Sequence, residues 1–307
     1  MAWFIKRAGL HMGLLIAVFC ASFLLFHVVP TDPARSILGP QASEDQVNQL
    51  RKSLGLDQSL FKQATQYAQA AINLDFGRSF IDGRLVSAEL ENKFPTTLAL
   101  ILIAALLSFS YAFISLFMLA RGYGHLLSIF NFSISTLPTL FVAVLIALVS
   151  LKFYPYTTYT ANLSDFENWM ALLPPSLVLA LYPMATLSRI VQSNTSDLLR
   201  TQFILAARAR GLPETSIYFK HILRNLLIPI VALFSNVLPQ LFTAAFIVEI
   251  VFSLPGIGSL LVKSILQQDF PMLEGIVLTN AIVVIGAYII SDALYPLIDP
   301  RVRSGHE

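Results

Sequence analysis

Six apolar runs, each long enough to cross a lipid bilayer as a helix, constrain this chain more than any other feature of its sequence. The hydrocarbon core of a bilayer is about 30 Å thick, so a spanning helix needs roughly 20 apolar residues. The runs cover residues 9–29, 96–120, 129–153, 171–190, 226–252 and 275–298. We therefore predict an all-α membrane protein with six transmembrane helices. The fourth run is the most interrupted, because Pro174, Pro175 and Pro183 lie within it.

The composition agrees with a membrane protein. Of 307 residues, 56% are hydrophobic and 12% are charged, and the mean hydropathy is +0.70, well outside the range of soluble domains. The net charge of +2 is too small to indicate a nucleic-acid partner. The single Cys20 excludes an intramolecular disulfide, and the scattered histidines have no spacing typical of a metal site, so we expect no bound metal.

The distribution of Lys and Arg predicts the orientation, because basic residues accumulate in cytoplasmic loops. Residues that fall on one side are Lys6, Arg7, Arg121, Arg189, Arg200, Arg301 and Arg303, whereas the segment 154–170 contains neither Lys nor Arg. Both termini are therefore expected in the cytoplasm. The first run is longer than the apolar part of a signal peptide, so we interpret it as an uncleaved span.

The segment 30–95 is the only sizeable part outside the apolar runs, and it carries helix signals. Ser43 and Gln46 have the spacing of a capping box, which predicts a helix that ends at Gly55. Residues 60–72 predict a second helix, and Asp82-Gly83 is typical of a tight turn. We expect three parts: residues 1–29 as the first span, 30–95 as a small helical cap outside the membrane, and 96–303 as the membrane core, with a cytoplasmic loop at 201–225.

The segment 203–229 follows the fourth apolar run and leads into the fifth, and it has a helix–glycine–helix pattern. Ala206 and Ala207 favour a helix, and their small side chains allow the backbone of another protein to approach it closely. Gly211 can adopt the positive φ of a helix C-cap, Pro213 suits the first position of the next helix, and Glu214 is favourable in its first turn. The pattern predicts a sharp elbow.

Basic residues flank this elbow, at Arg208, Arg210, Lys220 and Arg224. The positive-inside rule therefore places it in the cytoplasm. The rule alone explains these residues if the elbow is a solvated loop. Alternatively, a small-residue helix with a rigid turn can act as a lever that docks into a groove of a cytosolic partner.

This segment resembles the EAA loop of binding-protein-dependent ABC importer permeases, in the form of the dipeptide, oligopeptide and nickel branch. Ala206, Ala207 and Gly211 match the alanines and glycine of that motif, and Leu205 stands at its glutamate position. The family continuation H-x-x-R-N-x-x-x-P is matched by His221, Arg224, Asn225 and Pro229. The resemblance implies a coupling helix that sits in a cleft of the ATPase subunit. Its implied contact residues are Ala206, Ala207, Arg208, Arg210, Gly211 and His221.

Further motifs extend the resemblance over nearly the whole chain. They are 29–33, which is similar to the family's PGDP with Thr31 in place of glycine, then 54–58, 75–80, 95–98, 255–258, 269–271 and 299–303. The resemblance implies a bacterial inner-membrane subunit that pairs with a homologous second permease, two cytosolic ABC ATPases and an extracytoplasmic solute-binding protein. It implies short peptides as cargo, with nickel or a metal–chelator complex as the next choice.

No P-loop motif G-x-x-x-x-G-K-[ST] is present, so we expect no cofactor on this chain and ATP with Mg on the partner ATPases. The absence of a G-x-S-x-G serine or a local carboxylate pair argues against a membrane-embedded enzyme. An ATP-independent secondary transporter or channel is the main alternative. Against it, we find no clear inverted repeat and no paired intramembrane charges.

Polar residues in the fifth run suggest a translocation pathway. Asn236, Gln240 and Thr243 follow i, i+4, i+7 spacing, which places them on one stripe of a helix. Such a stripe either lines a water-filled cavity or forms hydrogen bonds to neighbouring helices.

Two acidic residues lie close to the membrane interior, Glu249 and Asp292. Because both are near helix ends, we favour structural roles, with Glu249 near an outer gate. The gate would include the turn residues Pro255, Gly256 and Gly258.

Overall fold

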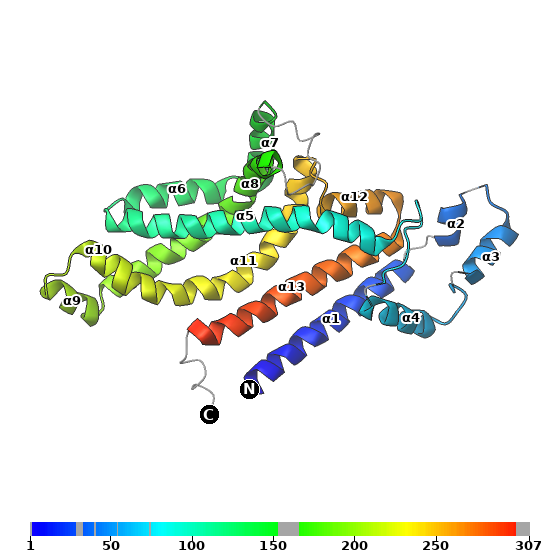
Figure 1. The fold of residues 1–307 in the computed structure, drawn as a ribbon, viewed down its shortest axis with the longest axis horizontal. Helices are drawn as coiled ribbons and strands as arrows, with labels where there is room; N and C mark the ends of the chain where they lie inside the picture. Colours follow the sequence, from blue (N-terminus) through cyan, green and yellow to red (C-terminus); the bar gives the residue numbers. More distant parts are fainter. Residues whose placement is uncertain are drawn as a thin grey trace. The chain divides into compact units, whose positions relative to one another are not determined.

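The computed structural model describes residues 2–28, 33–39, 41–53, 55–73, 75–152 and 166–298, and its helices are shown in Figure 1. Across these residues the regular structure is helical, apart from one antiparallel bridge between Arg78 and Leu85. The predicted all-α class is confirmed. The chain folds into two compact units. The first unit comprises Met1–Thr96 and Pro255–Ile285, and the second comprises Thr97–Leu254 and Gly286–Glu307.

The first unit contains the N-terminal helices and the hairpin of helices near residue 268. Its complete helices are α1 (Ala2–Val28), α2 (Pro33–Leu38), α3 (Glu44–Ser53), α4 (Leu60–Ile72) and α12 (Ile257–Gln267). It also holds the beginnings of α5 (Val86–Ala120) and α13 (Phe270–Ile298), each of which continues into the second unit.

The predicted capping box opens α3. The Ser43 backbone N–H donates to Gln46 Oε1 at 3.1 Å, and the Gln46 N–H donates back to Ser43 Oγ at 3.3 Å. After α3, Gly55 adopts a φ of 70°, which a residue with a Cβ rarely does. The helix predicted over 60–72 is α4. Local sequence signals therefore predicted both helices, because each depends on bonds within a few residues.

Aromatic side chains join α4 to α1. The Tyr67 ring stacks on Phe19, with the centroids 5.6 Å apart, and lies 6.5 Å from the Phe23 ring. Burial and the nearby Glu274 carboxylate raise the pKa of the Tyr67 hydroxyl. Tyr67 therefore stays neutral, which suits a phenol held among apolar rings.

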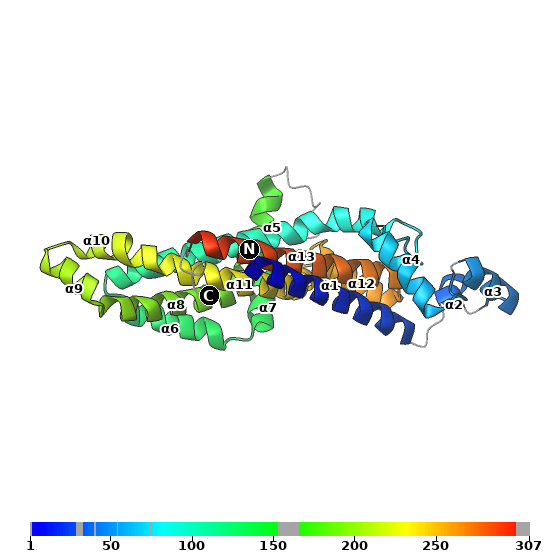
Figure 2. The ribbon, with the colours of Figure 1, turned by 90° about the horizontal axis from the view of Figure 1, so that it is seen from below.

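The second unit is organised around one long helix, α8 (Phe166–Leu199), which packs against α6 (Gly124–Thr136), α7 (Thr139–Ser150) and α11 (Leu223–Val251). Between α8 and α11 the chain forms α9 (Gln202–Ala209), α10 (Glu214–Ser216) and a π-helix, η2 (Ile217–Ile222). Figure 2 shows α9 and α10 at the far end of α8 and α11.

Among the described residues, three helical segments are long and apolar enough to cross a membrane, at Val86–Ala120, Trp169–Leu199 and Phe270–Ile290. The predicted third span, 129–153, is not one helix. Leu137 and Pro138 are extended, and α6 and α7 meet there at 95°. The residue before a proline disfavours the helical region, which explains the break. The pair counts as a fourth candidate span only if both helices are taken together.

The three prolines of α8 do not interrupt it. The helix continues through Pro174, Pro175 and Pro183 for 34 residues. Packing against α6, α7 and α11 surrounds this helix on several sides, and neighbouring helices allow a membrane helix to tolerate proline.

In the described part of the first unit, Gly275 allows helix α13 to lie very close to the start of α5. A Cβ added at this position would lie 2.5 Å from Val86 Cγ1 and 3.3 Å from Phe76 Cβ. Real Cβ atoms do not approach so closely, so the absence of a side chain allows α13 to pack against the start of α5.

We predict that Gly275→Ala lowers the free energy of unfolding by about 1–3 kcal/mol, the usual cost of overpacking. Thermal unfolding of the purified protein in detergent measures this change. Gly286→Ala is the matched control on the same helix, because a Cβ at Gly286 meets nothing within 4 Å. Adding Val86→Ala should restore part of the loss, and equal stability of the two glycine variants would contradict the close approach.

Candidate functional site

The predicted elbow is present. Helix α9 ends at Ala209, and Gly211 adopts a φ of 78°. The Leu212 N–H donates to the Ala207 carbonyl at 3.3 Å, and the Gly211 N–H donates to the Arg208 carbonyl at 2.9 Å, so the turn closes on the last residues of α9. One detail of the prediction was wrong. Pro213 is the N-cap of α10 instead of its first helical residue, so the helix begins at Glu214.

The inner face of the elbow is part of the hydrophobic core of the second unit. Ile204 and Ala207 of α9 are buried in this core. The cluster is completed by Ala112, Leu116, Leu187, Val191, Ile217, Tyr218, Ile222, Leu226 and Ile230. These residues come from α5, α8, η2 and α11. A displacement of α9 would therefore act directly on three long helices, because packed side chains transmit such a movement.

The outer face of the elbow exposes apolar side chains. Phe203 is 47% exposed, Leu205 is 52% exposed and Leu212 is 37% exposed. Ala206, between them, is exposed as well. A group of exposed apolar residues beside basic side chains is typical of a protein-interaction surface.

An ion pair braces the elbow. Arg208 Nε donates to Glu214 Oε1 at 2.8 Å, and its terminal Nη2 donates to Oε2 at 3.1 Å. This two-point contact across Gly211 was missed from the sequence, where Arg208 was considered as a basic flank and as an implied contact of the ATPase, but not as a partner of Glu214. Both side chains are substantially exposed, so the pair contributes little to stability but orients the guanidinium along the turn.

The chain beyond the elbow begins with a π-helix. His221 lies half-buried in η2, and its carbonyl accepts a hydrogen bond from Asn225 Nδ2 at 2.8 Å. Arg210, the C-cap of α9, is exposed. The π-helix was not predicted. Its wider turn places Ile217, Tyr218 and Ile222 together in the core, which no local signal in the sequence indicated.

The predicted pathway residues lie on α11. Gln240 and Thr243 are both exposed, and Thr243 Oγ1 donates to the Pro239 carbonyl at 3.2 Å. The side chain of Asn236 lies outside the described residues. Gln240 and Thr243 are three residues apart, so they lie exposed on the same side of α11.

Glu249 is fully buried in the last turn of α11. Its carboxylate accepts a hydrogen bond from Thr97 Oγ1 of α5, two residues after Pro95, the proline within that helix. This contact joins two long helices in the second unit. Asp292 lies half-buried in α13.

The predicted gate turn differs from expectation in one respect. The residue with a left-handed backbone is Ser253, with a φ of 53°. Gly256 has extended backbone and caps α12, and Gly258 is buried inside that helix. Pro255 precedes the cap. The left-handed position near this turn is therefore a serine, and Gly258 belongs to the helix instead of the turn.

A buried polar network within the second unit was missed entirely from the sequence. Asn131 Nδ2 donates to Ser188 Oγ at 2.7 Å, and Ser115 Oγ donates to the same oxygen at 2.8 Å. The Tyr111 hydroxyl donates to Asn131 Oδ1 at 3.0 Å. These bonds join α5, α6 and α8 at one level. Hydrogen-bonded polar residues between membrane helices are typical of specific helix packing.

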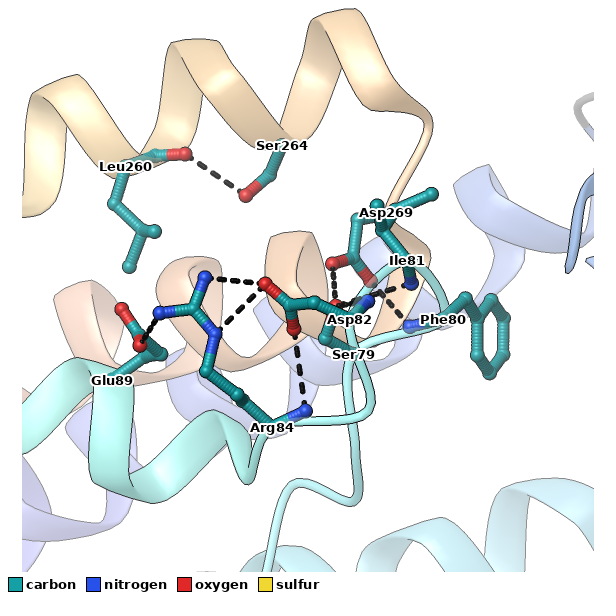
Figure 3. Close-up of polar contacts among 9 residues, drawn as sticks. All are labelled: Ser79, Phe80, Ile81, Asp82, Arg84, Glu89, Leu260, Ser264 and Asp269. Atoms are coloured by element: carbon teal, nitrogen blue, oxygen red, sulfur yellow. Dashed lines mark hydrogen bonds and ion pairs between the residues drawn. The ribbon is translucent and has the colours of Figure 1, made fainter.

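Two of the sequence motifs meet in the first unit, as Figure 3 shows. Ser79 Oγ donates to Asp269 Oδ2 at 2.5 Å, and the Phe80 N–H donates to Oδ1 at 3.1 Å. Asp269 is 3% exposed and Ser79 is 5% exposed. The contact attaches the 79–84 loop to the turn between α12 and α13. A charge-assisted, buried contact of this kind holds a loop firmly.

The other side of the same loop is held by Arg84. Its Nε donates to Asp82 Oδ2 at 2.8 Å, and its terminal nitrogens contact Asp82 and Glu89. The bond from Arg84 lowers the pKa of Asp82 to about 2. The Asp82 carboxylate therefore remains charged at any physiological pH, and the predicted Asp82-Gly83 turn is a closed one, with Gly83 at a φ of 69°.

Similarity to known proteins covers almost the whole chain. Residues 112–304 match the family model for the inner membrane component of binding-protein-dependent transport systems, and residues 1–101 match the model for its N-terminal part. The oligopeptide transport system permease protein AppB of Bacillus subtilis is 28% identical over 98% of this chain and 99% of its own length. The glutathione transport system permease protein GsiC of Escherichia coli K12 is 29% identical over 95% of this chain and 96% of its own length.

We predict that Asp269→Asn frees the 79–84 loop, because asparagine keeps the capacity to cap α13 but loses the charge that strengthens the bonds to Ser79 and Phe80. Trypsin cleavage at Arg78 or Arg84 of the purified protein should become roughly tenfold faster. Ser264→Ala is the control, since Ser264 Oγ donates to the Leu260 carbonyl of its own helix and has no other bond to the residues that the structure describes. Unchanged cleavage in Asp269→Asn would contradict this role of Asp269.

Proposed function

The chain belongs to the family of inner membrane components of binding-protein-dependent transport systems, and we propose that it is the subunit through which an ABC importer carries short peptides into a bacterial cell. It is a multi-pass permease and not an enzyme. One named relative belongs to an oligopeptide transport system and the other to a glutathione transport system, and glutathione is itself a short peptide. These names support peptide cargo over nickel or a metal–chelator complex.

The observation that carries the proposal is the shape of the elbow. Its inner face is buried among α5, α8 and α11, whereas its outer face exposes Phe203, Leu205 and Leu212. A partner that binds the outer face can therefore move the helices behind the inner face. We propose that this partner is a cytosolic ABC ATPase. In that complex Ala206, Arg210 and Gly211 lie at the contact, Arg208 orients the turn through Glu214, and Ala207 and His221 support it from behind.

The mechanism follows from this arrangement. ATP and Mg bind to the two ATPase subunits, and their closure displaces α9 towards the membrane. Because the elbow shares a packed core with three long helices, the displacement tilts those helices together and exposes the pathway to one side of the membrane and then to the other. A homologous second permease completes the pathway, and an extracytoplasmic binding protein supplies the cargo.

We further propose a six-span topology with both termini in the cytoplasm. The spans are α1, α5, the bent pair α6 and α7, α8, α11 and α13, and the helices α2, α3 and α4 form a cap on the outer side. The positive-inside distribution supports this orientation, since Arg121, Arg200 and the elbow arginines all fall on the cytoplasmic side. An ATP-independent carrier is less favoured, because such a carrier does not need a docking elbow.

In this topology Gln240 and Thr243 lie on the pathway, together with Asn236 on the same stripe. The exposure of Gln240 and Thr243 on one side of a largely apolar stretch of α11 supports the assignment, because an amide in contact with lipid is costly. Glu249, held by Thr97, lies near the outer end of α11, and we assign it to a proposed outer gate together with Pro255, Gly256 and Gly258.

We expect Gly211→Asp to abolish uptake and to release the ATPase while the permease still inserts and folds. A Cβ at Gly211 meets nothing within 4 Å, so the side chain itself causes no clash, although the positive φ adds a backbone cost of about 1–2 kcal/mol. The new charge would instead face the partner. Purification of the tagged importer in mild detergent, followed by mass spectrometry of the bound subunits, measures the loss.

Gly122→Asp is the matched control. Gly122 also has a positive φ, of 84°, and a Cβ there also meets nothing within 4 Å, but it lies at the turn between α5 and α6. We expect this variant to retain the ATPase. Retention of the ATPase by Gly211→Asp, or its equal loss from both variants, would refute the proposed docking surface.

Asn236→Leu combined with Gln240→Leu should reduce uptake severalfold and leave the ATPase bound, because a polar stretch of the pathway becomes apolar while the elbow is untouched. Uptake of a labelled peptide into proteoliposomes, with the subunits quantified in parallel, tests this expectation. Undiminished uptake would assign both residues to helix packing.

A further inference from the structure

A second polar stripe lies on α8, and none of its members was considered for the pathway. Tyr182, Thr186, Arg189, Ser193 and Ser196 follow one another at intervals of three or four residues, which places them on one face of the helix. Thr186 is partly exposed and the other four are exposed. Tyr182, Thr186 and Arg189 lie within the apolar run 171–190 of this helix, whereas Ser193 and Ser196 lie in its polar continuation. A polar face on such a helix indicates contact with water or with polar groups instead of lipid.

Arg189 lies well inside this helix. It is ten residues before the end of α8 at Leu199, which corresponds to about 15 Å along the axis. The neighbouring Ser188 bonds to Ser115, and α5 continues from Ser115 to Ala120, about 8 Å further. By both measures the α-carbon of Arg189 is more than one helical turn from the cytoplasmic ends of the helices.

The Arg189 guanidinium points away from that cytoplasmic end. One terminal nitrogen donates to Ser135 Oγ at 2.8 Å and the other lies 3.4 Å from Thr186 Oγ1. Thr186 is one turn before Arg189 on α8, and Ser135 lies eleven residues into α6, about 16 Å from its start at the cytoplasmic turn. A side chain that extends to the inner lipid headgroups would turn towards Gln192 instead.

The positive charge of Arg189 has no counter-ion within the described part of the chain. Its partners there are the two neutral hydroxyls of Ser135 and Thr186, and the ion pairs of the described residues involve Arg35, Arg84 and Arg208. Five N–H donors of a guanidinium exceed what two hydroxyl oxygens accept. The exposed guanidinium therefore keeps donors that an anionic group can use.

We propose that Arg189 is a cargo-binding residue of the translocation pathway and that it recognises a carboxylate of the passing peptide. This inference rests on the proposed import of peptides. A guanidinium binds a planar carboxylate through two parallel hydrogen bonds, and every unmodified peptide carries one at its C-terminus. The hydroxyls of Thr186, Ser193 and Ser196 extend the same face and can bond to peptide groups whatever the side chains of the cargo.

The test compares two labelled tripeptides of the same sequence, one with a free C-terminal carboxylate and one with a C-terminal amide, in proteoliposomes that hold the complete importer and its binding protein. The ratio of acid to amide uptake is measured for the wild type and for Arg189→Gln. The preference of the binding protein cancels when the two ratios are compared. We expect the ratio to fall about tenfold in Arg189→Gln, the loss of one charge-assisted contact, and to be partly retained in Arg189→Lys.

Arg200→Gln is the matched control, because Arg200 follows the end of the same helix and is also exposed; its ratio should equal that of the wild type. An unchanged ratio in Arg189→Gln overturns the proposal. Equal loss of both peptides with an intact complex also overturns it, since that result indicates a role in helix positioning. An effect that appears only with anionic lipids, and equally for both peptides, would assign Arg189 to a lipid phosphate. If the wild-type importer takes up neither peptide, the proposed function itself fails.

A second measurement tests whether the stripe faces water and is independent of how well the amide is delivered. Ser193→Cys, in a Cys20→Ser background, should react with a hydrophilic maleimide in the assembled importer, and the free-acid tripeptide should slow the reaction severalfold during transport. The same slowing should be lost when Arg189→Gln is added. A cysteine that does not react at all would place the stripe against lipid or another subunit and would contradict the proposal.

Discussion

The hydrogen bonds that converge on the Ser188 hydroxyl set the arrangement of the second unit. Asn131 and Ser115 both donate to this oxygen. These bonds fix the positions of α5, α6 and α8 along their axes and their rotations about those axes. A rotation of α8 would bury these polar groups without partners, which is costly away from water. The exposed face of α8, with Arg189 one residue beyond Ser188, is therefore determined by what its buried face must satisfy.

The same helix continues towards the elbow, so the two proposed sites share one rigid element. Leu187 and Val191 flank Ser188 on α8 and belong to the core that also contains Ile204 and Ala207 of α9. Movement of the elbow would therefore reach the level of Arg189 through packed side chains instead of a flexible linker. In the first unit, Asp269 also joins segments that are distant in the sequence, because it attaches the 79–84 loop to the α12–α13 turn.

Local signals in the sequence predicted much of the fold. The capping box at Ser43, the helix over 60–72 and the turn at Gly211 were correctly predicted, because each depends on bonds between residues only a few positions apart. The motifs that resemble the permease family pointed to the family that the whole-chain similarity then established. The effect of proline within apolar runs was predicted less accurately. Pro138 divides the third run into α6 and α7, whereas the three prolines of α8 leave that helix continuous.

The sequence by itself determined the apolar character of the long helices, the position of the elbow and the charge distribution around it, since these follow from residue type and spacing. Only the tertiary structure decided which faces those helices bury. Asn131 and Ser188 are far apart in the sequence and unremarkable in it, yet they meet in the core. Ser79 and Asp269 are 190 residues apart and form one contact. Arg189, which counted in the sequence only as a marker of orientation, has its significance because its two partners are neutral.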